Sequence, residues 1–294
     1  MWHPTGLVLG PGGIKGFMEL GFLLYMEKND LLPQFDSIIG VSIGSVIGLL
    51  YTAGYSIIEI INEASKTNIM DDISQIKFSD IKENAGLIPQ QKLRETLEGL
   101  IKAKFGKVLT MGELYQATGI HLHITSLELD KDNPHPVYFS HLVEPNISCV
   151  EAVLLSANIP LIFRRLYYKG KSYVDGALAD PYPIHVLDDG KRDVLGIYIA
   201  ADFDKDDNFI TYVRQIIYAG MVQIRNLSIN HSSKRCRHVG LHSKLIDPIG
   251  LTTNADVKVG MVTEGFEIAK QFFEQNGGQI SVSPDKIDVI EGDS

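Results

Sequence analysis

Residues 37 to 44 of the chain read Ser37-Ile38-Ile39-Gly40-Val41-Ser42-Ile43-Gly44. The run before Gly40 is apolar and predicts a strand, and apolar residues recur at helical spacing from Ile43 to Tyr55. Between them, the pattern G-x-S-x-G is typical of a serine on a sharp strand-to-helix turn, although a purely structural turn also fits it. Gly40 and Gly44 are needed there because side chains would collide. We therefore expect Ser42 to project at a helix start, where the Ile43 amide can face an oxyanion.

The uncharged stretch around this turn runs from Ser37 to Ile58 and is long enough to cross a bilayer. Serines, glycines and a threonine interrupt it throughout. We therefore predict a strand, a tight turn and a buried helix in the interior of a protein, rather than a membrane span.

A glycine-rich loop precedes the turn, between a predicted strand at 6–9 and a predicted helix at 17–28. It reads Gly10-Pro11-Gly12-Gly13-Ile14-Lys15-Gly16. Backbone amides at a helix start bind negative charge, so a nucleotide-phosphate or other phosphate site is one interpretation. However, Pro11 occupies the first glycine position of the dinucleotide fingerprint, and Lys15 does not stand in a Gly-Lys-Ser/Thr context. A structural turn that only permits close packing is a further alternative.

The two predicted strands suggest a different use for this loop. If they are parallel neighbours, their carboxyl ends meet at one edge of the sheet and the loop lies beside Ser42. The amides of Gly12 and Gly13 are then candidates for an oxyanion hole, with Lys15 in support.

The rest of the chain alternates predicted helices and strands, which favours a three-layer α/β/α sandwich with a mostly parallel central sheet. Capping boxes predict helix starts near Ser56, Thr110 and Ser148. The other predicted segments are helices at 89–105, 209–230 and 254–276 and strands at 120–127, 136–140, 172–174 and 194–200. We expect one domain over residues 1–276 and a polar, acidic tail at 277–294.

The amino-acid composition limits the classes of function that the protein can have. The 294 residues are 45% hydrophobic and 21% charged, so most of the chain is expected to fold around a core. The net charge of −9 disfavours binding to nucleic acid. Only Cys149 and Cys236 are available, too few for a disulfide framework. Since the N-terminus also lacks the features of a signal peptide, we expect a cytoplasmic protein, in peripheral contact with membranes if its substrate requires this.

A serine nucleophile needs a proton acceptor, and none of the nine histidines stands in a setting that marks it out. The segment that does stand out is Lys171-Ser172-Tyr173-Val174-Asp175-Gly176-Ala177. Here an aspartate ends a strand, and small residues allow another segment to approach. The sequence therefore makes Asp175 a candidate to face the edge of the sheet.

Three blocks, in this order, resemble the signature of the patatin-like phospholipases. They are Gly12-Gly13-Ile14-Lys15-Gly16, the turn at Ser42, and Asp175-Gly176-Ala177. The run Ser156-Ala157-Asn158-Ile159-Pro160-Leu161-Ile162-Phe163 resembles that family's small-residue and proline stretch, and the helix around Gly265 resembles its closing helix. The resemblance thus spans about residues 6 to 276.

The resemblance implies cleavage of acyl esters in lipids, with Ser42 as nucleophile and Asp175 as general base, and without a metal or cofactor. Pro11 departs from the family pattern, because many members have another glycine there, and it removes one amide from the loop. An aspartate is a weak base at its ordinary pKa, so we expect burial to raise the pKa of Asp175.

The expected substrate is a phospholipid or another acyl-ester lipid. Arg164, Arg165, Lys169 and Lys171 form a basic stretch that we interpret as a solvated hairpin, with contact to a lipid phosphate as the alternative. We assign the helix at 209–230 to ordinary core, with an acyl-pocket wall as the alternative. Acyl transfer on the same scaffold is the closest competing activity. Val41 disfavours it, because acyl-carrier-protein transacylases usually carry histidine just before the nucleophile.

Overall fold

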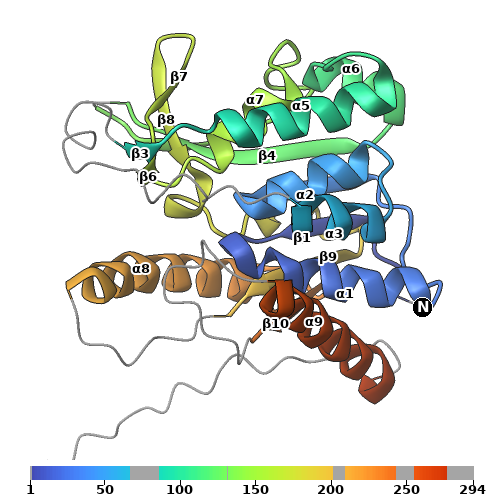
Figure 1. Cartoon of the computed structure of the whole chain (residues 1–294). Helices are drawn as coiled ribbons and strands as arrows, with labels where there is room; N and C mark the ends of the chain where they lie inside the picture. The colour runs from blue at the N-terminus through green and yellow to red at the C-terminus, as the bar shows by residue number, and fades with distance from the viewer. Residues whose placement is uncertain (1, 67–85, 131, 201–208, 243–254, 277–294) are drawn as a thin grey trace, which may run out of the picture.

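The computed structural model describes residues 2–66, 86–130, 132–200, 209–242 and 255–276 (Figure 1). The predicted acidic tail at 277–294 lies outside the described residues. Within them, a central sheet is flanked by helices on both of its faces, as the sequence predicted.

The central sheet is mostly parallel and has the strand order β10-β9-β1-β2-β4-β8-β7, with β5 also paired to β4. Its first five strands run parallel, and β5, β7 and β8 pair antiparallel. A second pair, β3 and β6, is also parallel. The strands are β1 (Gly6–Leu9), β2 (Ser37–Val41), β3 (Gly86–Ile88), β4 (His121–Glu128), β5 (His135–Phe139), β6 (Leu161–Phe163), β7 (Leu166–Tyr168), β8 (Lys171–Asp175), β9 (Val194–Ile199) and β10 (Cys236–Leu241).

Both faces of the sheet are covered, and the side chains of β1 show how. Leu7 and Leu9 point into the larger core, whereas Val8, between them, points into a smaller core on the other face. The described helices are α1 (Gly16–Lys28), α2 (Ile43–Thr52), α3 (Ile57–Lys66), α5 (Gln91–Phe105), α6 (Met111–Thr118), α7 (Cys149–Ser156), α8 (Phe209–His231) and α9 (Ala255–Asn276).

The local signals for these elements are largely confirmed. At Thr110 both hydrogen bonds of the capping box are present, and the box at Ser56 precedes α3 in the same way. At Ser148 the hydroxyl caps α7 by accepting the amide of Glu151, whereas the carboxylate of Glu151 pairs with Arg94 at 2.6 Å. The uncharged stretch from Ser37 forms β2, the turn and α2, and α2 ends earlier than predicted. No helix in the described part of the chain is both long and apolar enough to span a membrane.

One assignment from the sequence is wrong. Helix α8 is not ordinary core along its length, because Tyr212, Ile216 and Ile217 are exposed to solvent. The sequence pattern was misleading because helical spacing of apolar residues shows that they share a side, but not that another element covers that side. The predicted basic hairpin is confirmed as β7 and β8, and all four of its cationic residues are exposed.

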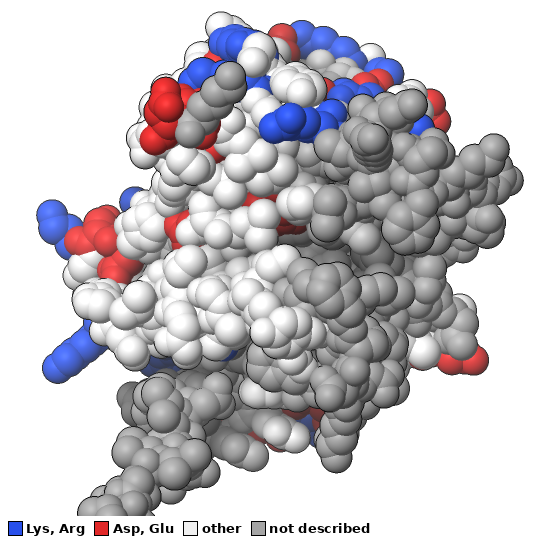
Figure 2. All heavy atoms as spheres, turned by 90° about the vertical axis from the view of Figure 1, so that its left-hand side faces the viewer, with Lys and Arg blue, Asp and Glu red and all other residues white. Residues whose placement is uncertain are grey.

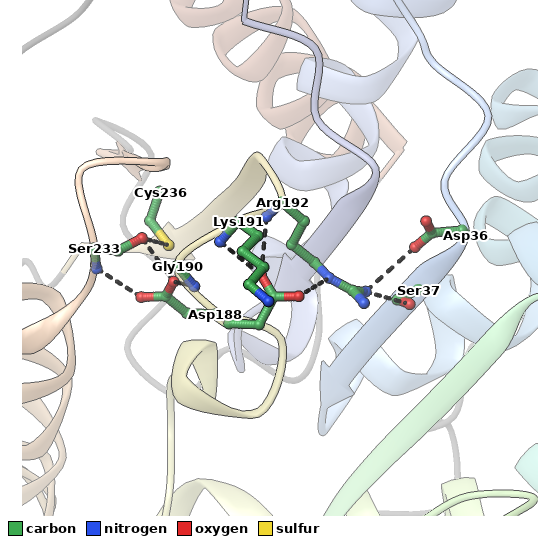
Figure 3. A network of polar contacts seen from close by, with 9 residues as sticks. Asp36, Ser37, Asp188, Gly190, Lys191, Arg192, Ser233 and Cys236 are labelled. Atoms are coloured by element: carbon green, nitrogen blue, oxygen red, sulfur yellow. Dashed lines mark hydrogen bonds and ion pairs between the residues drawn. The ribbon is translucent and has the colours of Figure 1, made fainter.

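Polar contacts close the edge of the sheet at which the parallel strands begin (Figure 3). Arg192, just before β9, donates a hydrogen bond to Ser37 at 2.8 Å and pairs with Asp36 at 3.4 Å. Asp188 accepts two hydrogen bonds, both of 2.6 Å, from the amide and hydroxyl of Ser233. This edge is therefore tied together by the loop before β9, and the loops that carry the candidate site lie at the opposite edge.

Candidate active site

Ser42 lies between the end of β2 and the first turn of α2. Its backbone has φ 56° and ψ −121°, in the left-handed half of conformational space, which a non-glycine residue adopts only at a cost of about 1–3 kcal/mol. Gly40 makes the turn feasible, because a Cβ there would overlap the backbone of Gly44 and Ser45. Strand and helix thus hold Ser42 in the strained geometry of a nucleophile elbow.

Asp175 ends β8 beside this turn. Its backbone amide donates to the carbonyl of Asn158 at 2.9 Å, and its carboxylate accepts the amide of Ala177 at 2.9 Å. Gly176 packs on the backbone of Thr125, which is the register partner of Val41 in β2. The serine and the aspartate therefore reach one place across β4, which lies between their two strands.

The two side chains interact, and both are buried. Ser42 faces Asp175 as a hydrogen-bond donor. Burial raises the pKa of Asp175 from its ordinary 3.8 to about 6, while the hydrogen bonds from Ser42 and from the Ala177 amide act in the opposite direction. The direction of the shift agrees with the expectation from the sequence, and its largest cause is desolvation. Within the described residues, no hydrogen bond to either side chain comes from a histidine.

The glycine-rich loop packs against the elbow. A Cβ on Gly44 would overlap the backbone carbonyls of Leu9 and Gly10, and a Cβ on Gly16 would lie 2.5 Å from Ile43. Because β1 and β2 are parallel neighbours, as the sequence predicted, both turns leave the same edge of the sheet. The loop and the serine turn are therefore in direct backbone contact.

The predicted oxyanion residues all lie at this junction. Gly13 has φ 55° and opens a short 3-10 turn that ends at Lys15, and the amide of Lys15 donates to the carbonyl of Gly12 at 3.0 Å. Ile43 is the first residue of α2, where amides have no partner within the helix. The roles of these amides, and that of the half-buried Lys15 side chain, remain predictions.

Sequence reasoning missed the residues that brace the site. Ser156 accepts the Ser42 amide at 3.0 Å. The backbone carbonyl of Asn158 accepts the Asp175 amide. The Asn158 side chain donates to the carbonyl of Tyr173 at 2.9 Å and accepts a hydrogen bond from the side chain of Gln90 at 3.2 Å. The only sequence signal for Ser156 and Asn158 was the small-residue and proline stretch noted above, and nothing local indicated Gln90.

Glu19 was also missed. It lies on α1, is fully buried, and accepts the amide of Gly10 at 3.1 Å. Its second carboxyl oxygen has no hydrogen-bond partner among the described residues. Burial raises the pKa of Glu19 well above its usual value, which favours the neutral acid beside the glycine loop.

The fold and the elbow place the chain among α/β proteins that carry a serine on a strand-to-helix turn. The model of one family, described as "Patatin-like phospholipase", matches residues 7–188. The chain therefore belongs to the patatin-like phospholipases, which are lipid hydrolases.

The chain is also similar to two viral proteins in sequence and to two solved structures in fold. The chain is 28% identical to "Uncharacterized protein R571" of Acanthamoeba polyphaga mimivirus, over 86% of this chain and 87% of that one. It is 26% identical to "Probable lipid hydrolase 463L" of Invertebrate iridescent virus 6, over 61% of this chain and 62% of that one. The fold is similar to that of the type III effector ExoU, with a TM-score of 0.56 at 15% identity, and the match covers 93% of this chain but 53% of ExoU. The fold is also similar to that of VipD from Legionella pneumophila, with a TM-score of 0.52 at 15% identity. That match covers 93% of this chain and 67% of VipD.

Proposed function

We propose that this protein hydrolyses acyl esters of phospholipids or lysophospholipids through an acyl-Ser42 intermediate, with Asp175 as general base. The single observation that carries the proposal is the strained Ser42 facing the buried carboxylate of Asp175, whose pKa of about 6 suits proton transfer near neutral pH. The name of the iridescent-virus relative, a probable lipid hydrolase, supports the same substrate class.

In the first half-reaction, the Ser42 oxygen attacks the ester carbonyl carbon while its proton passes to the Asp175 carboxylate. The negative oxygen of the tetrahedral intermediate is assigned to the amides of Gly12, Gly13 and Ile43, each contributing about 3–4 kcal/mol if well placed. When the intermediate collapses, the bond to the leaving alcohol breaks and Asp175 returns the proton to that alcohol. In the second half-reaction, Asp175 removes a proton from water, the water oxygen attacks the acyl-enzyme, and the proton returns to Ser42 as the fatty acid leaves.

Acyl transfer is the alternative that uses the same intermediate, with an acceptor alcohol in place of water. A phosphate-binding protein using the loop at 10–16 is the alternative without catalysis. A fluorophosphonate probe separates these two alternatives, because phosphate binding requires no activated serine.

The test is a panel of lipid esters incubated with the full chain, with Ser42→Ala and Asp175→Ala as controls. We expect fluorophosphonate labelling at Ser42 and free fatty acid as product, both lost in Ser42→Ala. A chelator is expected to leave the rate unchanged. The proposal fails if both variants hydrolyse the panel as fast as the parent protein. A cytoplasmic location is part of the proposal and agrees with the two free, buried cysteines.

A further inference from the structure

Helix α8 exposes apolar side chains where a surface helix normally exposes charged ones. Tyr212 is 58% exposed, Ile216 57%, Ile217 47% and Leu227 57%. Tyr212, Ile216 and Leu227 recur at helical spacing and so share one side of the helix. No charged residue occurs from Gln215 to Ile224. We call the four exposed apolar residues the α8 face.

The opposite side of α8 is fixed to the sheet. Arg225 is buried, stacks over the ring of Tyr198 at 4.3 Å, and donates to the carbonyl of Ile199 at 3.2 Å. Tyr218 donates to the same carbonyl at 3.4 Å. Because these contacts set the rotation of the helix about its axis, the α8 face is held outward.

Helix α8 borders the candidate active site. Helix α8 contacts the 3-10 turn Gly176–Leu178, which begins directly after Asp175. Ile199, held by the inner side of α8, also lies against Gly12: a Cβ on Gly12 would come within 2.5 Å of Ile199 Cγ1. The helix therefore flanks both the aspartate and the glycine-rich loop.

Charge is sparse across this side of the molecule. Figure 2 shows a largely uncharged centre, with lysine and arginine atoms at the top and at the left edge. In the basic hairpin, Lys169 pairs with Glu144 and Lys171 with Glu128, each at 2.7 Å. Two of the four hairpin cations are thus paired, and the net charge of the protein is −9, so attraction to anionic lipid is weak. The chemistry that fits the α8 face is apolar insertion into a lipid surface of low net charge.

We propose that the α8 face docks this protein on a zwitterionic phospholipid surface, with Tyr212, Ile216, Ile217 and Leu227 inserted at the boundary between head groups and acyl chains. The inference rests on the proposed function, since the substrate of a lipid acyl hydrolase resides in such a surface. Docking through α8 brings the edge of the sheet that carries Ser42 and Asp175 to the lipid.

The test compares the full chain with a double variant, Ile216→Asp with Ile217→Asp, and with a control, Leu142→Asp. Leu142 is 73% exposed but lies beside His141, whose ring is 4.9 Å from that of His121 at the start of β4, at the opposite edge of the sheet. Each protein is mixed with phosphatidylcholine vesicles, and the bound fraction is measured by flotation. Hydrolysis is measured on the same vesicles and on a monomeric short-chain ester.

We expect the double variant to lose about tenfold or more in vesicle partitioning, because two exposed apolar side chains no longer insert. Vesicle hydrolysis falls in parallel, whereas hydrolysis of the monomeric ester stays at the parental rate. Leu142→Asp behaves as the parent. Raising sodium chloride from about 0.05 M to about 0.5 M changes the partitioning of the parent by less than about twofold.

The inference is overturned if the double variant partitions like the parent, if Leu142→Asp loses partitioning equally, or if salt abolishes the binding of the parent. It is also overturned if sedimentation shows a parental dimer that the double variant alone loses while both bind vesicles alike, since the α8 face then contacts a second copy. Failure of the proposed function has a different signature. Ser42 does not react with the fluorophosphonate and the monomeric ester is not cleaved, whatever the flotation result.

Discussion

The backbone amide of Ser42 donates a hydrogen bond to the hydroxyl of Ser156, 3.0 Å away and 114 positions later in the chain. This contact joins the start of α2 to the end of α7 and helps to hold the left-handed backbone of the elbow. It also occupies the Ser42 amide, so that the amides left to face an oxyanion are those of neighbouring residues.

Replacing Ser156 by alanine leaves that buried amide without its acceptor. We expect Ser156→Ala to lower the free energy of unfolding by about 1–3 kcal/mol and to slow fluorophosphonate labelling of Ser42. The matched control is Ser140→Ala, which removes another buried serine hydroxyl, one that accepts the Val143 amide at 3.4 Å away from the elbow. Equal labelling rates in the two variants would show that Ser156 does not position the elbow.

The pH dependence of activity tests the raised pKa of Asp175. A general base works in its ionised form, so with a pKa of about 6 the rate constant kcat/KM is expected to fall about tenfold per pH unit below that value. The measurement uses a soluble ester, so that binding to lipid does not contribute. An acid limb near pH 4, or one that persists in Asp175→Ala, would exclude Asp175 as the base.

The same shift predicts a stability gain from removing the charge. Because the pKa is higher in the folded state than its ordinary 3.8, ionisation of Asp175 opposes folding. The contribution of Asp175 to the free energy of unfolding is therefore most favourable near pH 4, and about 3 kcal/mol of it is lost as the pH rises through 6. Asp175→Asn is expected to unfold at higher denaturant concentration than the parent at pH 8, with little difference at pH 4. Asp130→Asn, at an exposed aspartate, serves as the control for the loss of a surface carboxylate.

Glu19 is predicted to position the glycine-rich loop through the amide of Gly10. Glu19→Gln keeps a hydrogen-bond acceptor at that place and is expected to retain labelling of Ser42, whereas Glu19→Leu leaves the amide unpaired and is expected to slow labelling about tenfold or more. Since burial raises the pKa of Glu19, Glu19→Gln is also expected to be more stable than the parent at alkaline pH. If Ser42 is labelled equally fast in Glu19→Gln and Glu19→Leu, the contact between Glu19 and the Gly10 amide has no positioning role.

A substitution at Gly44 tests the packing between the glycine-rich loop and the elbow. In Gly44→Ala the added Cβ overlaps the carbonyls of Leu9 and Gly10, so the loop must move away from Ser42. We expect at least a hundredfold loss of esterase activity, the size of the effect when an oxyanion donor is removed. The comparison is Gly99→Ala on α5, where a Cβ meets open space and the better helix propensity of alanine adds about 0.5–1 kcal/mol of stability.

Much of the fold was predictable because its signals are local. The capping box at Thr110 and the partial alternation along β4 depend on residues a few positions apart. The parallel pairing of β1 and β2 followed from general rules of topology. Strand β10 was missed, because its buried and half-buried residues do not alternate strictly and its place in the sheet is set by pairing with β9.

By itself, the sequence determined the type of turn at Ser42 and the glycine-rich loop before it, because glycine spacing acts over a few bonds. It also indicated Asp175, through the resemblance of short blocks to a family. Tertiary structure alone decided that Asp175 is buried against Ser42, that Ser156 and Glu19 brace the two turns, and that no described element covers one side of α8. Burial and long-range partners depend on which surfaces meet, and the spacing of residues along a chain does not contain that information.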